Sequence, residues 1–364
     1  MKLAIASDQP ATKALLEEIA HLCAAHGAQW HPQLQVEVKE GAMCLMAPPE
    51  TTGALISLPT ELLLPIEAAQ WSGSADALQL LQPPPAATAV QRELLQLHAE
   101  LYNATGKLPW WSSQHPARLI DASANVAAAL APLKPGHGAQ LERSAAEGFL
   151  ATRSFGWRST LEQEQRQPVL MPLIDLLNHH HQGAPYAISD GTMRIKAAQA
   201  GSRECFAHYG NRRDVLDLAL HYGHCDHSTP FAHSAPLEIT VEGVGNIRVE
   251  HQGQRAPVHP FDPPRVTLEP DGLRLSHLCC HQEHPERVQT MLNLALQGSL
   301  KRSGLGEIGS QQLAQKGLNA IGEANLRLLD QLAAAAQSSP HPGAATLAAA
   351  AHRQALIIQE VLGA

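Results

Sequence analysis

"MPLIDLLNHHHQGAPY", residues 171–186, places an asparagine and three consecutive histidines directly after an apolar run that carries one aspartate, Asp175. Asparagine and histidine side chains can ligate a metal, hold a small ligand or lie in a solvated loop. These three uses remain open for Asn178 and residues 179–181 when this stretch is considered alone, so the rest of the chain has to distinguish them.

The composition limits the possible classes of function. With 364 residues, the chain can form two domains, each with its own core. Its net charge of −8 does not favour nucleic acid or an anionic membrane surface. We find no apolar run that could span a bilayer and no signal peptide in "MKLAIASDQPATK". Six cysteines without a framework spacing favour a reducing cytoplasm.

Hydrophobic periodicity predicts an order of elements in which strands are interrupted by helices and then followed by more helices. A turn is expected at Gly41 and a linker at the triple proline 83–85. Helices are predicted over 10–28, 88–104, 212–222 and most of 284–364, and strands over 34–38, 53–59, two parts of 185–209 and parts of 236–277. This order indicates an α+β region followed by a helical one.

Four motifs, taken in their order along the chain, resemble those of the SET-domain protein methyltransferases. The subgroup is that of the Rubisco large-subunit lysine enzyme and the actin-histidine enzyme. "PLIDLLNH" (172–179) is similar to the family's "P-[LM]-[AI]-D-[ML]-[IL]-N-H" segment. "HYGNRRDVLDLALHYGH" (208–224) is similar to its tyrosine-containing strand, helix and closing Tyr-Gly-Phe. "GAMCLMAPPETTGALISLPTELLLP" (41–65) and "AAEGFLATRSFGW" (145–157) resemble the two earlier motifs.

The resemblance implies a SET-type β fold with a helical insert, followed by an all-α C-terminal domain that binds the protein substrate. It divides the chain into an N-terminal helix with the first part of the SET domain (1–85), the helical insert (86–150), the SET core (151–235) and the mainly helical C-terminal domain (236–364). The family transfers a methyl group from S-adenosylmethionine to a side-chain nitrogen, usually that of lysine.

The resemblance also implies a cofactor site around Asn178 and His179, which would bind the amino-acid end and the adenine. Arg153 would pair with the cofactor carboxylate, a geometry that arginine suits; an unpaired surface arginine is the alternative. Asp175 corresponds to the family's aspartate before the asparagine, or it caps a helix or turn. Gly41 and Met43 occupy the first motif, where Met43 replaces the family's second glycine, a position at which the missing Cβ lets the backbone approach the cofactor.

Two tyrosines are implied as catalytic residues. Tyr222 corresponds to the tyrosine whose hydroxyl faces the methyl group and the incoming amine, and Tyr209 to the one that lines the lysine channel. The alternatives are a half-buried aromatic at a helix end for Tyr222 and a strand aromatic packed on the sheet for Tyr209. After Tyr222 and Gly223, the family's phenylalanine is replaced by His224.

The 21 histidines provide a rival interpretation, because "HYGHCDHS" and "HLCCHQEH" contain possible metal ligands. Neither has a C-x-x-C or H-E-x-x-H spacing, so we predict no metal site, and we expect His180 and His181 to lie in a solvated loop. The sequence thus predicts a cytoplasmic, S-adenosylmethionine-dependent protein-lysine methyltransferase. A histidine methyltransferase of the same fold and a non-catalytic SET-like binding protein are the alternatives.

Overall fold

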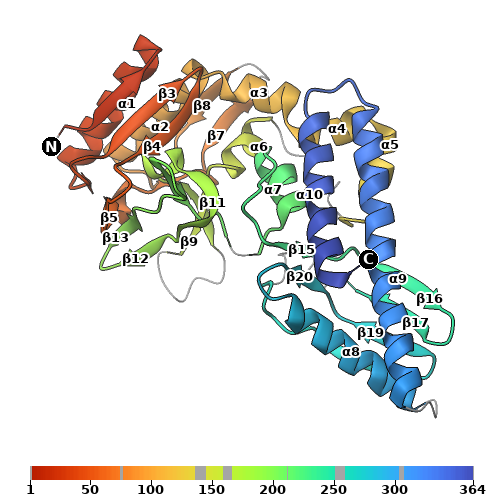
Figure 1. Ribbon diagram of the computed structural model, residues 1–364. Coiled ribbons are helices and arrows are strands. Elements are labelled where there is room, and N and C mark those ends of the chain that lie inside the picture. Colours follow the sequence, from red (N-terminus) through yellow and green to blue (C-terminus); the bar gives the residue numbers. More distant parts are fainter. Residues whose placement is uncertain are drawn as a thin grey trace. The chain divides into compact units, whose positions relative to one another are not determined.

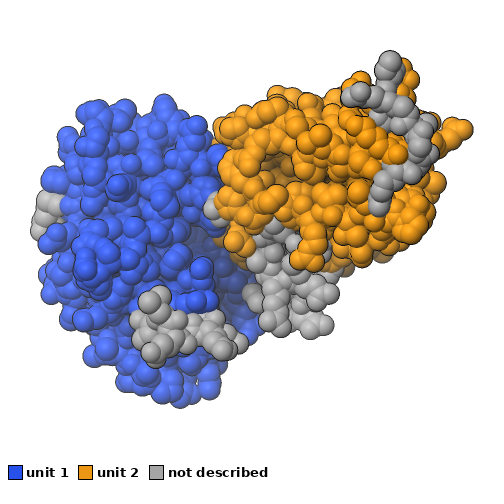
Figure 2. Space-filling view, turned by 90° about the horizontal axis from the view of Figure 1, so that it is seen from below, with its two compact units in different colours: residues 1–113, 143–210 blue, residues 114–142, 211–364 orange. Residues whose placement is uncertain are grey.

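The computed structural model describes residues 2–73, 77–135, 145–158, 166–210, 212–250, 259–302 and 307–363. The chain forms two compact units, each built from two separate segments (Figure 2). The first unit comprises Met1–Ser113 and Arg143–Gly210, and the second comprises Gln114–Glu142 and Asn211–Ala364. Each unit has its own hydrophobic core, so each is described separately.

The helices predicted near the N-terminus are confirmed. Helix α1 (Pro10–Ala25) begins at a proline, which is favourable in the first helical turn, and it buries Leu16, Ile19 and Cys23. Helix α2 (Ala89–Ala104) begins with a capping box, in which the Thr88 side chain accepts a hydrogen bond from the backbone N–H of Gln91 and the Gln91 side chain returns one. It follows the triple proline.

The main sheet of the first unit has five strands in the order β1-β3-β4-β14-β11. Strands β3, β4 and β11 are labelled in Figure 1. The strands are β1 (Ala4–Ser7), β3 (Gln35–Lys39), β4 (Ala42–Met46), β14 (Glu204–Ala207) and β11 (Asn178–Ala184). Strands β3 and β4 form a hairpin whose turn contains Gly41, as predicted, while β14 is antiparallel to β4 and parallel to β11. Segments more than 130 residues apart in sequence are thereby neighbours in one sheet.

Shorter sheets complete the first unit. The predicted strand at 53–59 is confirmed as β5. Of the two strands predicted within 185–209, the second is confirmed as β14, whereas the first is a hairpin of two strands, β12 and β13. One sheet contains β12 (Ala187–Ser189), β13 (Thr192–Lys196), β5 (Ala54–Pro59) and β2 (Gln29–Trp30). The others contain β6 (Leu64–Pro65), β10 (Gln167–Leu170) and β9 (Phe155–Trp157), and β7 (Gln70–Gly73) with β8 (Leu78–Gln82).

Helices occupy the described parts of the predicted insert, 86–150. After α2 come α3 (Lys107–Gln114), α4 (Pro116–Ala122), α5 (Ala124–Leu130) and α6 (Ala145–Ala151). Residues 86–113 belong to the first unit and residues 114–142 to the second. The helical character of this segment is therefore present, while its role as a single insert stays a prediction.

The second unit combines helices with strands, so the prediction of an all-α C-terminal domain is wrong. Helix α7 (Val215–Tyr222) confirms the helix expected at 212–222, and α8 (Pro285–Arg302), α9 (Glu307–Gln337) and α10 (Ala344–Leu362) follow. A four-stranded sheet contains β16 (Leu237–Val241), β17 (Gly245–Val249), β19 (Gly272–Leu275) and β18 (Val266–Glu269). Strands β15 (Phe231–His233) and β20 (Cys279–His281) form a separate pair.

The strands of the second unit are stabilised because they bury apolar side chains in its hydrophobic core. Ile247, Leu273 and Leu275 are fully buried in the core that the helices also line. Among the described residues, no helix is both long and apolar enough to cross a membrane. The molecule is thus a mixed α+β protein whose C-terminal part is rich in helix.

Candidate functional site

Three of the four sequence motifs lie on, or directly next to, adjacent strands of the main sheet. Strand β4 follows the Gly41 turn, β11 begins at Asn178, and β14 leads into Tyr209. The register pairs Leu45 with Cys205 and Asn178 with Phe206. Because β4 and β14 are antiparallel, the Gly41 end of β4 lies toward the Tyr209 end of β14.

Asn178 is exposed at the start of β11. The chain reaches it through a tight segment in which Leu173 has a φ of +66°, followed by a 3₁₀ turn at Ile174–Leu176. A positive φ is uncommon for leucine, so the surrounding core has to hold this turn in place. The Asn178 Nδ2 atom donates a hydrogen bond to Glu204 Oε1 at 2.7 Å, which ties β11 to β14 through side chains as well as backbone.

His179 contacts Tyr209 and so connects two of the predicted site motifs. Its Nδ1 atom accepts a hydrogen bond from the Tyr209 backbone N–H at 3.1 Å, and the two ring centroids are 5.2 Å apart. The Tyr209 hydroxyl donates to the Leu177 carbonyl at 2.5 Å. Since successive residues of a strand point in opposite directions, the Asn178 and His179 side chains diverge at the first two residues of β11.

The next two histidines do not form a solvated loop, so that prediction is wrong. His180 and His181 belong to β11 and are half-buried. The His180 ring packs at 5.3 Å from Phe206, and the His181 ring at 5.5 Å from His208. The strand can continue here because its register shifts between His179 and Ala184.

A buried polar cluster in the first unit contains Asp175, which sequence reasoning placed near the cofactor. Asp175 is 7% exposed, and its Oδ2 atom accepts a hydrogen bond from the Tyr102 hydroxyl at 2.5 Å. Burial and the Asp175 charge raise the pKa of Tyr102 well above its ordinary value, so this hydroxyl stays a donor. Asp175 therefore stabilises the core through Tyr102 and does not cap the turn by itself.

Arg153 lies beside this cluster. Its guanidinium carbon is 5.2 Å from the Tyr102 ring centroid and 5.3 Å from that of Phe149, and its Nη1 donates to the Asp175 carbonyl at 3.4 Å. Burial and the Arg153 charge lower the pKa of Lys107. The Arg153 Nε and Asp175 Oδ1 atoms are buried and have no hydrogen-bond partner among the described residues. The cluster therefore keeps one unsatisfied donor and one unsatisfied acceptor, which a polar ligand could satisfy.

The first motif has a structural use in this fold. Gly41 has a φ of +75°, and a Cβ added there would lie 2.4 Å from the Thr105 carbonyl oxygen, so glycine is required for the turn to approach the end of α2. Met43 is 6% exposed and belongs to the hydrophobic core. Core packing thus accounts for both residues, and their contact with a cofactor remains a prediction.

Tyr222 lies in the second unit, at the last residue of α7. The helix ends there because Gly223 adopts a left-handed conformation at φ +80°, a common way of terminating a helix. The Arg213 guanidinium carbon is 5.1 Å from the Tyr222 ring centroid. Burial raises the pKa of Tyr222, and the Arg213 charge opposes this effect. Burial also lowers the pKa of His224, so this neighbouring histidine favours its neutral form.

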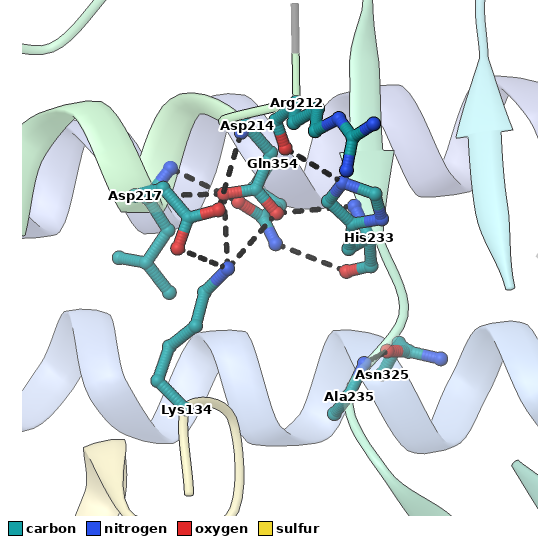
Figure 3. A network of polar contacts seen from close by, with 9 residues as sticks. Lys134, Arg212, Asp214, Asp217, His233, Ala235, Asn325 and Gln354 are labelled. Carbon is teal, nitrogen blue, oxygen red and sulfur yellow. Dashed lines mark hydrogen bonds and ion pairs between the residues drawn. The ribbon is translucent and has the colours of Figure 1, made fainter. Parts of the chain in front are cut away.

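A buried network of charges holds the other end of α7 (Figure 3). Lys134 Nζ lies 3.1 Å from Asp214 Oδ1 and 2.8 Å from Asp217 Oδ1. Asp214, which is fully buried, also caps the helix by accepting a hydrogen bond from the Asp217 N–H at 2.9 Å. Its other oxygen accepts the His233 backbone N–H at 3.1 Å. The Oε1 atom of Gln354 in α10 accepts a hydrogen bond from the Leu216 backbone N–H at 3.1 Å.

Sequence reasoning missed three residues that contact the predicted site residues: Tyr102, Glu204 and Arg213. Tyr102 is 73 residues from Asp175, and Glu204 is 26 from Asn178, so no local spacing could reveal either contact. Arg213 stands nine residues before Tyr222 in the same motif, but the motif does not predict that the two side chains meet. All three contacts depend on tertiary structure.

The histidine and cysteine clusters do not gather into a metal centre in the part of the chain that is described. Among those residues, no group of three or more His, Cys, Asp or Glu side chains is arranged to hold a metal ion. A cavity of about 190 Å³ in the second unit is lined by residues that include Phe261, Cys279, His281 and His284. The Phe261 and His281 rings stack there at 4.8 Å, so these side chains pack mainly against one another.

Comparison with known proteins finds similarity at the level of structure only. No family model matches the sequence. No curated protein matches it either. A solved structure described as "Structure of Rubisco LSMT bound to AdoMet" is similar over 96% of this chain and 91% of that chain, with 11% sequence identity and a TM-score of 0.43.

Proposed function

We propose that this chain is an S-adenosylmethionine-dependent protein N-methyltransferase that acts on a lysine side chain. The observation that carries the proposal is the arrangement of the main sheet: the Gly41 turn, the Asn-His motif and the Tyr209 motif come from distant parts of the sequence and meet on adjacent strands. The direct contact between His179 and Tyr209 supports a single site there.

The polar groups of the first unit fit the proposed cofactor. S-adenosylmethionine, when bound, supplies an activated methyl group, and its amino-acid end carries a carboxylate and an ammonium group. The buried, unpartnered Nε of Arg153 suits a carboxylate, since a charged donor and acceptor form a strong hydrogen bond. The Asn178 amide offers both a donor and an acceptor. Arg153, Asn178 and His179 would hold the cofactor in this proposal.

The proposed roles of the tyrosines follow from their chemistry. A lysine amine must lose its proton before it can attack, because its ordinary pKa is about 10.4. A tyrosine hydroxyl can orient the neutral amine, and the pKa of Tyr222 is raised by burial, so its hydroxyl keeps its proton in the neutral range. The presence of Tyr222 favours lysine over histidine as the acceptor, because the actin-histidine relative lacks the tyrosine of the closing motif.

The remaining parts of the proposal concern the partner and the location. The acceptor would be a cytoplasmic protein, held by the helix-rich second unit. A non-catalytic SET-like binding protein is the second candidate, and the burial of Met43 in the core favours it, since this residue replaces a glycine of the family motif. The two candidates differ in whether the cofactor binds.

Titration calorimetry with S-adenosylmethionine and its demethylated product tests the proposal. We expect micromolar binding by the intact chain and a roughly tenfold weaker affinity for Asn178→Ala, because one or two hydrogen bonds to charged groups are lost. Gln182→Ala, an exposed residue of the same strand, serves as the control and should bind normally. No binding at millimolar ligand would contradict the proposal and favour the non-catalytic protein.

A further inference from the structure

Glu204 is the acidic neighbour of Asn178, and nothing in the sequence motifs assigns it a role. The two side chains lie on the same face of the main sheet because Asn178 pairs with Phe206, and Glu204 precedes Phe206 by two residues. Such diagonal neighbours on adjacent strands are within reach of long side chains. The 2.7 Å hydrogen bond between Asn178 Nδ2 and Glu204 Oε1 confirms that they meet.

This hydrogen bond fixes the orientation of the Asn178 amide. A carboxylate accepts hydrogen bonds and repels another acceptor, so the amide must turn its NH₂ group toward Glu204. The Oδ1 atom of Asn178 then points away from Glu204 and can accept a hydrogen bond from a ligand. An amide oxygen and a carboxylate next to each other form a site for a small cation with several N–H donors.

The surroundings of Glu204 favour the binding of a cation. Within the described residues, no lysine or arginine nitrogen lies within ion-pair distance of the Glu204 carboxylate. The neighbouring strand β4 carries Cys44 on the same face, so the Cys44 thiol lies in the electric field of the Glu204 carboxylate. Burial raises the pKa of Cys44 to about 11, with further contributions from Glu204 and Glu37. An ammonium group would be attracted to this face of the sheet.

We propose that Glu204 and Asn178 form the subsite for the primary ammonium group of S-adenosylmethionine, with Glu204 supplying the charge and the Asn178 Oδ1 an acceptor. This inference rests on the proposed function and goes further by naming the residue that distinguishes ligands with an amino-acid end from those without one. Glu204 acts here as a binding residue, with no part in proton transfer.

A comparison of three adenosine ligands separates this role from a structural one. S-adenosylmethionine and S-adenosylhomocysteine both carry the ammonium group, whereas methylthioadenosine lacks the whole amino-acid end. In Glu204→Gln, an amide oxygen can still accept the Asn178 hydrogen bond, but the negative charge is removed. Glu37→Gln removes one charge from the same face, on a strand that is separated from β14 by β4, and is the matched control.

We expect titration calorimetry to show that Glu204→Gln lowers the affinity for both ammonium-bearing ligands by tenfold or more, because a charge-assisted hydrogen bond is lost. Methylthioadenosine should bind both proteins equally, and Glu37→Gln should change each affinity less than threefold. Unchanged affinities in Glu204→Gln, or an equal loss for all three ligands, would overturn the subsite while leaving the proposed function in place. If the unaltered protein binds none of the ligands, both proposals are wrong.

Discussion

At the scale of single residues, Gly41 shows how a position can be required by the fold itself. The two residues of the β3–β4 turn, Glu40 and Gly41, both have positive φ values, of 51° and 75°, as two-residue hairpin turns of the favoured kind require. The Thr105 carbonyl leaves no space for a side chain at Gly41. Gly53 has a similar φ of +85°, but nothing lies within 4 Å of its missing Cβ.

These two glycines form a matched pair for mutation. Gly53→Ala should lower the free energy of unfolding by about 1 kcal/mol, the usual penalty of a left-handed residue with a side chain. Gly41→Ala should lower it by at least about 2 kcal/mol more, because the backbone must also move away from Thr105. Urea denaturation of both variants measures the difference, and equal losses would contradict the close contact seen here.

Tyr222 provides the second prediction at this scale. Tyr222→Phe keeps the ring packed under Arg213 and removes only the hydroxyl. If this hydroxyl orients the acceptor amine, methyl transfer should fall on the order of 100-fold, as expected when a reacting group loses its alignment. The affinity for S-adenosylmethionine should stay within twofold. Transfer of a labelled methyl group and calorimetry measure the two quantities, with Tyr186→Phe as the control; equal losses of both would reject the catalytic role.

At the scale of elements, the stability of helix α7 depends more on a network of charged side chains than on the length of the helix. The helix has only eight residues, but Lys134, Asp214 and Asp217 hold its first turn, and its core-facing side is fully buried. Burial lowers the pKa of Lys134, but the two aspartates outweigh this effect and raise it above its ordinary value. Burial would raise the pKa of Asp217, but Lys134 lowers it to about 2.

Removing the lysine should therefore destabilise the second unit strongly. Lys134→Met leaves two aspartates without their counter-charge, a change that typically costs about 3–5 kcal/mol for a buried pair. Lys316→Met removes an exposed lysine that pairs with Glu242 in the same unit and should cost less than about 1 kcal/mol. Thermal or urea denaturation distinguishes the two, and similar losses would show that the buried network contributes little.

The same network predicts a dependence on pH. The folded-state pKa of Asp217, about 2, lies below its ordinary value of 3.8, so its stabilisation is complete above pH 4 and is lost as the pH falls toward 2. Between pH 4 and pH 2, the free energy of unfolding should therefore fall by up to about 2 kcal/mol, both in the unaltered protein and in Lys316→Met. Lys134→Met should lack this loss, since its aspartates no longer gain from ionisation. Denaturation curves at pH 4 and below measure it, and parallel behaviour of both variants would contradict the assignment.

At the scale of the whole molecule, the chain has two cores that share no residue. One core contains Leu16, Val36 and Leu45, and the other contains Leu216, Ile321 and Ile358. Units with separate cores often unfold in separate steps. The second unit is nevertheless built from residues 114–142 as well as 211–364, so neither unit is a single continuous segment.

Two unfolding transitions are therefore expected in scanning calorimetry. Gly41→Ala should lower the midpoint of one transition and Lys134→Met that of the other, because each residue belongs to a different unit. Hydrogen exchange with mass spectrometry can assign each transition to its peptides. A single transition that both variants shift by similar amounts would show that the two units unfold as one.

Local sequence patterns predicted most helices and several strands. The helices at 10–28, 88–104 and 212–222 follow from periodic apolar residues and their end signals, which act within a few residues. The local pattern also predicted strands within 236–277, and β16, β17, β18 and β19 confirm them. The all-α C-terminal domain was implied only by the family resemblance, and the pairing of these strands shows that it is wrong. Strand pairing depends on partners far along the chain, and no local pattern encodes them.

For the candidate site, the sequence by itself determined only the residue types from which a site was predicted: the Asn178–His179 pair, Arg153 and the two tyrosines. Only the tertiary structure decided what they contact, namely Glu204 beside Asn178, and Tyr209 beside His179. Residue types and local spacing are properties of the chain, whereas these contacts arise from the order and register of strands that are far apart in sequence. The contact between Tyr102 and Asp175 also arises from the tertiary structure, because packing of the hydrophobic core brings together two residues that are 73 positions apart in sequence.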